Sequence, residues 1–201
     1  MFRFFKSISY IFHPVFIPLL GVLFYFSKTP RDIPKEIIWA KFISLSILTV
    51  VLPILLYFLL RNLGKANSIF LSTAKERVYP LLLNCVIVLL ILRRVLPIYE
   101  YVELYSFFMG ILISTFTCLV LAFFKFKASI HLMALGGLFI FCIALSIHFS
   151  KNFNGTLALL SIITGAVTTS RLLLNAHTYR ELTIGFFIGM IPQLLMVNHW
   201  L

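Results

Sequence analysis

The sequence predicts an all-α integral membrane protein, a bundle of six or seven transmembrane helices. Of its 201 residues, 61% are hydrophobic and only 11% are charged, whereas a soluble domain is roughly 45–50% apolar and about 25% charged. Apolar runs close to the ~20 residues that cross a bilayer recur along the whole chain. Because no linker or internal repeat separates them, we expect residues 1–201 to form a single membrane domain.

Seven apolar runs are candidate spans, each bounded by charged or turn-forming residues. They are approximately Ile8–Phe26, Ile38–Leu60, Val78–Leu92, Leu104–Phe124, Ile130–Phe149, Leu157–Ser170 and Leu182–Val197. The first run follows basic residues, as the core of a signal peptide does, but His13, Pro14 and Pro18 interrupt it. No small-residue cleavage site follows it, so we expect it to be retained as a helix.

The charge and cysteine content exclude several classes of function. The net charge is +11, and the basic residues lie between the apolar runs, where they suit interfacial anchors, anionic lipid headgroups or an anionic substrate. We therefore expect membrane lipids as partners and no nucleic acid. Cys85, Cys118 and Cys142 lie inside apolar runs without metal-ligand spacing, so we expect neither disulfides nor a metal, and no cofactor.

Two pairs of glycines are packing signals. Gly185 and Gly189 form a GxxxG motif in the last run, and Gly136 and Gly137 lie together in the fifth. Small residues allow helices to approach closely in lipid, so we interpret both pairs as helix contacts. The GxxxG motif is also a candidate surface for a homo-oligomer.

Three polar segments are expected on one face of the membrane. Arg61–Arg77, Lys125–Ser129 and Arg171–Glu181 follow the second, fourth and sixth runs. Two spans separate each segment from the next, so all three lie on the same side whether or not the first run crosses fully. Polar residues at the membrane edge of a bundle are candidates for function.

The last of these segments has the strongest chemistry. His177 and Glu181 are four residues apart, so they share one face of a helix that starts here. A carboxylate beside an imidazole fixes its tautomer and leaves one nitrogen as a nucleophile, and the fork of Arg171 suits phosphate oxygens. The alternative is structural, because Thr178 and Glu181 also match a capping box and the arginine suits an interfacial anchor.

The other two segments add candidate partners for a phosphate group. Lys127 and Ser129 precede the fifth run and could bind phosphate, and His131 could protonate a leaving alkoxide. Lys75 and Arg77 precede the third run and could complete an anion clamp. Each again has a structural alternative, as an interfacial anchor, an interface histidine or a helix cap. Taken together, the set suits phosphoryl transfer through a phosphohistidine without a metal.

The spacing of these residues resembles the type 2 phosphatidic acid phosphatases, the PAP2 superfamily. Their third motif, SRxxxxxHxxxD, is matched by Ser170-Arg171, His177 and Glu181, with Glu in place of Asp. Their second motif, PSGH, is half matched by Ala128-Ser129-Ile130-His131, and the first, KxxxxxxRP, only poorly by Arg77 and the nearby proline. The resemblance covers residues 61–190 approximately, and it implies a PAP2-like helical fold.

The resemblance also implies roles for these residues. His177 would be the nucleophile, Glu181 its orienter and His131 the general acid. The phosphate would be held by Arg171, Ser129, Lys127, Lys75 and Arg77. It implies a phosphatase or phosphotransferase for lipid phosphates or diphosphates, in the cell (inner) membrane with its active face outward. The alternatives are a catalytically inactive lipid-phosphate binder or transporter, and a structural membrane subunit.

Overall fold

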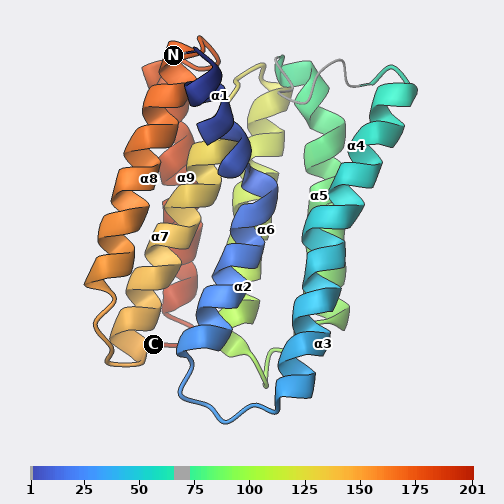
Figure 1. The fold of residues 1–201 in the computed structure, drawn as a ribbon. Coiled ribbons are helices and arrows are strands. Elements are labelled where there is room, and N and C mark those ends of the chain that lie inside the picture. Colours follow the sequence, from blue (N-terminus) through green and yellow to red (C-terminus); the bar gives the residue numbers. More distant parts are fainter. Residues whose placement is uncertain (1, 66–72) are drawn as a thin grey trace.

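The computed structural model describes residues 2–65 and 73–201, which form helices that run up and down one bundle (Figure 1). In chain order the helices are α1 (Phe2–Ile11), η1 (Pro14–Phe16), α2 (Ile17–Lys28), α3 (Lys35–Ser46), η2 (Ile47–Val51), α4 (Leu52–Asn62), α5 (Ala74–Arg94), α6 (Val102–Phe123), α7 (Ile130–His148), α8 (Asn154–Leu173) and α9 (Tyr179–Val197).

Six helical stretches in the described residues are long and apolar enough to cross a membrane. They are Phe4–Lys28, Lys35–Asn62, Val102–Phe123, Ile130–His148, Asn154–Leu173 and Tyr179–Val197. The predicted all-α, multi-pass architecture is thus confirmed. The third predicted run, Val78–Leu92, forms the middle of α5, which is not among the six because charged residues lie at both of its ends.

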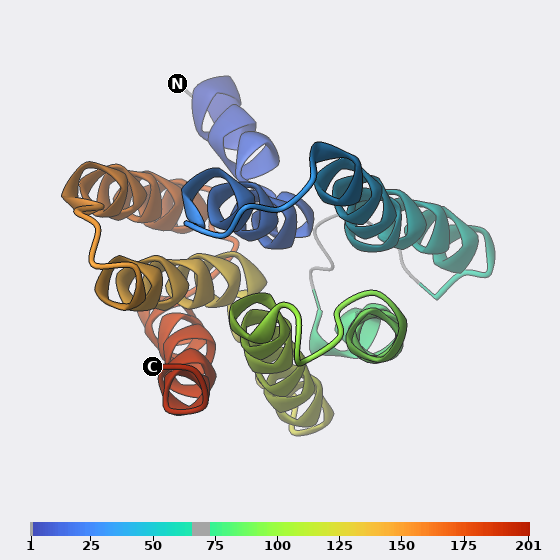
Figure 2. The ribbon, with the colours of Figure 1, turned by 90° about the horizontal axis from the view of Figure 1, so that it is seen from below.

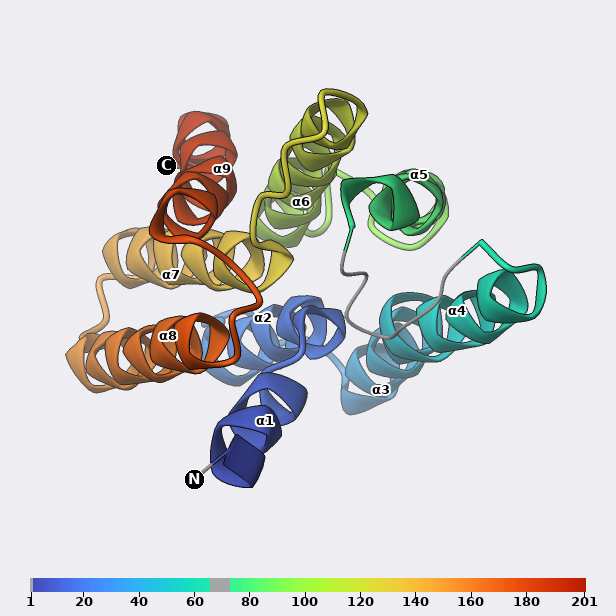
Figure 3. The same ribbon diagram turned by 90° about the horizontal axis from the view of Figure 1, so that it is seen from above.

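Prolines interrupt the first two stretches. Between α1 and α2, His13 caps the short 3₁₀ turn η1, and its Nδ1 accepts a hydrogen bond from the Val15 amide at 3.4 Å. The break turns α1 away from the axis of α2 (Figure 3). Between α3 and α4, the π-helical turn η2 precedes Pro53, which lacks the amide hydrogen that a regular α-helix would need there.

Glycines bring α7 and α9 into close contact. A Cβ on Gly185 would lie 2.6 Å from the backbone oxygen of Ser129, and one on Gly189 would overlap the backbone of Met133. The GxxxG motif is therefore used inside the chain, where it fixes the start of α9 beside the start of α7. A homo-oligomer through the same motif stays a prediction.

The polar segments meet at one end of the bundle, as predicted. The starts of α5, α7 and α9 all lie at the end that also carries the N-terminus (Figures 1 and 3). Residues 66–72 of the first predicted segment lie outside the described residues. The opposite end holds the C-terminus and the α2–α3, α5–α6 and α7–α8 connections (Figure 2). We call these the motif end and the far end.

Candidate functional site

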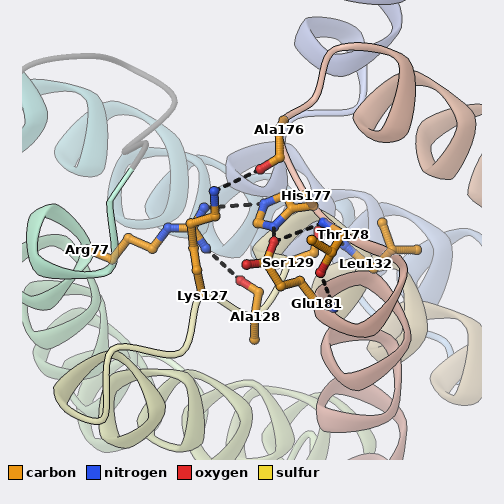
Figure 4. A network of polar contacts seen from close by, with 9 residues as sticks. All are labelled: Arg77, Lys127, Ala128, Ser129, Leu132, Ala176, His177, Thr178 and Glu181. Carbon is orange, nitrogen blue, oxygen red and sulfur yellow. Dashed lines mark hydrogen bonds and ion pairs between the residues drawn. The ribbon is translucent and has the colours of Figure 1, made fainter.

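The site is built from the first turns of three helices at the motif end (Figure 4). Arg77 lies in the first turn of α5, Lys127 precedes α7, and His177 precedes α9. A helix N-terminus carries a partial positive charge and exposes amide hydrogens, so three of them at one end form an electropositive region. The backbone alone therefore makes this end suited to an anion.

Contacts to both ring nitrogens fix the tautomer of His177. Its Nδ1 lies 2.8 Å from Oε2 of Glu181, and its Nε2 lies 3.3 Å from Nη2 of Arg77. A guanidinium only donates hydrogen bonds, so Nε2 must accept. Nδ1 therefore carries the proton and donates it to the carboxylate. The imidazole thus directs the lone pair of Nε2 toward the cations, as a nucleophile requires.

The surroundings keep this imidazole uncharged. Burial, followed by the charges of Arg77, Arg171 and Lys127, lowers the pKa of His177 from 6.5 to about 3. His177 is only 6% exposed, so water does little to stabilise an added proton. At neutral pH the ring is therefore a neutral base, whose Nε2 lone pair accepts the hydrogen bond from Arg77.

Glu181 serves the fold and the site at once. Its Oε2 accepts hydrogen bonds from His177 and from the Thr178 amide, the latter at 3.1 Å, while Thr178 Oγ1 accepts from the Glu181 amide at 3.3 Å. The predicted capping box is confirmed. The same carboxylate also contacts the imidazole, so the cap and the predicted pairing with His177 occur together.

Arg77 and Lys127 tie the converging segments together. Nη1 of Arg77 donates to the Ala128 carbonyl at 2.6 Å, and Nζ of Lys127 donates to the Ala176 carbonyl at 2.9 Å. Burial, followed by the opposing charges of Glu181 and Arg77, leaves the pKa of Lys127 lowered. Cations that contact neutral carbonyls keep their net positive charge, so the cluster retains an attraction for an anion.

Arg171 lies at the end of α8 and is only 2% exposed. Its charge lowers the pKa of both His177 and Lys127, which places it beside the same cluster. The preceding Ser170 hydroxyl donates to the Phe5 carbonyl at 2.6 Å and lies 2.8 Å from Ser9 Oγ. This serine fastens α1 to α8.

His131 is buried next to the cluster and contacts the N-terminal segment. Its Nε2 lies 3.2 Å from the Ser9 carbonyl, and its ring meets that of His13 edge-on at 5.5 Å. A carbonyl only accepts, so Nε2 of His131 carries a proton. No hydrogen bond joins His131 to His177 in the described parts of the chain, and a general-acid role would have to use Nδ1.

Ser129 and Lys75 are placed differently from the rest of the predicted set. The Ser129 hydroxyl caps α7, accepting from the Leu132 amide at 3.5 Å, and its own amide donates to the Glu181 carbonyl at 3.0 Å. Lys75 is exposed in the first turn of α5. The structure therefore brings together Arg77, Lys127, His177 and Glu181, with Ser129 and Arg171 alongside.

Two residues of this neighbourhood were not predicted from the sequence. Ser9 and His13 contact His131 across more than a hundred positions, and the only local signal was a histidine beside a proline in an apolar run. No group of three or more possible metal ligands lies together in the part of the chain that the structure describes.

No protein-family model, curated protein or solved structure matches this chain.

Proposed function

We propose that the protein is a membrane lipid phosphate or diphosphate phosphatase, or a phosphotransferase, that works through a phosphohistidine at His177. The single observation that carries the proposal is the tautomer of this ring. Its Nδ1 proton is held by Glu181, and the lone pair of Nε2 faces Arg77. The resemblance of the segment from Ser170 to Glu181 to the third motif of the type 2 phosphatidic acid phosphatases supports the same assignment.

The chemistry balances without a metal. A phosphate bound by Arg77 and Arg171 is attacked at phosphorus by Nε2 of His177. The bond between phosphorus and the lipid oxygen breaks, and that oxygen takes a proton from Nδ1 of His131 in its imidazolium form. Glu181 stabilises the positive charge that develops on the phosphorylated ring.

The second step regenerates the histidine. Water attacks the phosphoryl group and gives a proton to Nδ1 of His131, which regains its imidazolium form. The bond between nitrogen and phosphorus breaks, its electrons return to Nε2 of His177, and inorganic phosphate leaves. An acceptor alcohol in place of water makes the same protein a phosphotransferase. By the same resemblance, we propose that the motif end faces outward from the cell (inner) membrane.

A lipid-phosphate binder or transporter without catalysis is the second candidate. It is favoured by one observation, that Arg77 Nη2 lies directly against Nε2 of His177. A substrate phosphate has to draw the guanidinium away before the ring can attack. If it does not, the cluster binds an anion and cleaves nothing.

The test measures release of inorganic phosphate from dodecyl phosphate by purified protein in detergent micelles. His177→Ala should lose about 10³-fold or more in kcat, because the nucleophile is removed. His199→Ala, at an exposed position near the C-terminus, is the matched control and should keep full activity. Release that is equal in wild type and His177→Ala would overturn the proposal. Saturable binding without turnover in the wild type would establish the second candidate instead.

A further inference from the structure

An apolar cavity of about 300 Å³ lies inside the bundle beside the site. It is enclosed by η1 and α2 on one side, η2 and α4 on another, and α5 and α6 on a third. Residues from each wall include His13, Pro18, Tyr57, Pro80, Val88 and Phe108. Most of its lining is hydrocarbon, so an apolar occupant is favoured.

One end of the cavity reaches the cation cluster. Pro80 lies one helical turn, about 4.5 Å along the axis of α5, from Arg77. Ile130 also lines the cavity and stands between Ser129 and His131 in the chain. The His13 ring lines it as well and packs on the His131 ring. The apolar cavity is therefore a direct neighbour of the polar site.

The cavity also faces the bilayer. Ile54 and Phe58 line it, yet they are 40% and 50% exposed on α4. Their side chains are accessible from the cavity or from the surface of α4, so α4 is the wall through which a molecule from the bilayer would enter.

The dimensions suit one hydrocarbon chain. A cavity of 150 Å³ holds a benzene molecule, so 300 Å³ has room for about a dozen carbon atoms. Along α5 the lining runs from Pro80 to Val88, which is about 12 Å. Two acyl chains side by side would need a much wider space.

We propose that this cavity binds the chain of a single-chain lipid phosphate, an ester of phosphate or diphosphate with one alkyl or isoprenoid chain. The phosphate then lies at Arg77, Arg171 and His177, and the chain runs past His13 toward Val88. This inference rests on the proposed function of the site. It predicts discrimination against lipids with two chains, since only one fits.

The first test compares substrates in identical mixed micelles. Dodecyl phosphate and farnesyl phosphate carry one chain, straight or branched, and didodecanoyl phosphatidate carries two. We expect kcat/KM for the better one-chain ester to exceed that for phosphatidate by about tenfold or more, because each buried CH₂ changes affinity about fourfold. The ratio of kcat/KM between dodecyl phosphate and farnesyl phosphate then shows whether the cavity prefers a straight or a branched chain. Equal kcat/KM for one and two chains overturns the proposal.

The second test fills the cavity. Val88→Phe occupies it, whereas Leu89→Phe introduces the same side chain at a neighbouring position that is 52% exposed and does not line it. Val88→Phe should raise KM for the one-chain ester about tenfold and leave the hydrolysis of phenyl phosphate, which has no chain, unchanged. Leu89→Phe should change neither. No change in KM, or equal losses on both substrates, overturns the proposal.

A second pair of variants guards against misfolding. Ile54→Trp fills the cavity from the partly exposed wall of α4, and Leu55→Trp beside it is the control. If Val88→Phe does not yield folded protein, the same comparison and the same overturning results apply to this pair.

Binding separates failure of this inference from failure of the proposed function. If the wild type hydrolyses none of the esters, the proposed function fails. Displacement of a fluorescent alkyl phosphate by dodecyl phosphate then tests the chain site alone. Weaker binding in Val88→Phe but not in Leu89→Phe supports the inference, and equal binding in all three proteins overturns it.

Discussion

The two ends of the bundle treat buried charge in opposite ways. At the far end, Glu103 is fully buried and its carboxylate is surrounded by donors. Nη2 of Arg31 lies 2.7 Å from Oε1 of Glu103, and Nε2 of His148 lies 3.3 Å from the same oxygen. The Tyr25 hydroxyl donates a hydrogen bond to Oε2 of Glu103 at 3.1 Å. These four residues join three separate parts of the chain into one ion-paired cluster.

At the motif end the balance is reversed. Three cations, Arg77, Lys127 and Arg171, outnumber the two nearby carboxylates of Glu76 and Glu181, and Arg77 and Lys127 each donate a hydrogen bond to a backbone carbonyl. Removing one partner of a buried ion pair destabilises a fold, because the other charge is left buried without compensation. An excess of buried cations is costly to the fold and is useful where an anion binds. On the proposed function, variants at the far end should change stability and variants at the motif end should change activity.

Among the cations of the motif end, the largest expected effect is at Arg77. Arg77→Lys keeps the charge but cannot hold the Ala128 carbonyl and Nε2 of His177 together, so we expect activity on dodecyl phosphate to fall about 100-fold. Arg61→Lys, exposed at the same end, should change activity less than twofold. Similar activities of the two variants would contradict the assignment of chemistry to this end.

Substitutions at the far end should lower the stability of the protein instead of its activity. Glu103→Gln removes the charge that Arg31 and His148 contact, and we expect a loss of about 2 kcal/mol, or roughly 4–8 °C in the unfolding temperature. Activity of the folded variant should be unchanged. Glu100→Gln, at an exposed neighbouring position, is the control. A loss of activity without a loss of stability would contradict a purely structural role for Glu103.

The pH dependence of stability tests whether the buried ring of His177 is neutral in the folded protein. The folded state holds its pKa at about 3, below the ordinary value of 6.5, so the unfolded chain takes up a proton first as the pH falls. Stability is therefore complete above about pH 6.5 and is lost progressively toward pH 3. His177→Gln lacks this proton, so its unfolding temperature should fall less between pH 7 and pH 4.5. Parallel curves would show that the ring is not held neutral.

The smallest effect is expected at Lys75. This residue is exposed and lies outside the network of Figure 4, so its charge is screened by water and salt. Lys75→Ala should change KM for dodecyl phosphate by less than about threefold. A loss as large as that of Arg77→Lys would place Lys75 on the substrate after all.

Much of this arrangement could be predicted, because it depends on local spacing. The apolar runs predicted the helices, and their parity predicted that the three polar segments meet at one end. The spacing of His177 and Glu181 predicted their contact, and Thr178 predicted the cap. These are properties of single helices and of a chain that crosses a membrane repeatedly.

The remainder depends on contacts between distant segments. Ser9 and His13 reach His131 only because prolines turn α1 back over the start of α7. The cavity is lined by residues of η1, α2, η2, α4, α5 and α6, which lie far apart in the sequence. No spacing rule in the sequence links such positions.

The three helix N-termini at the motif end have a consequence for any attempt to abolish anion binding by mutation. Each start, those of α5, α7 and α9, contributes roughly half an elementary positive charge from peptide groups. Side-chain replacement leaves these groups in place. Even a variant without its arginines and lysine should retain a weak affinity for phosphate, a baseline that only unwinding the helices would remove.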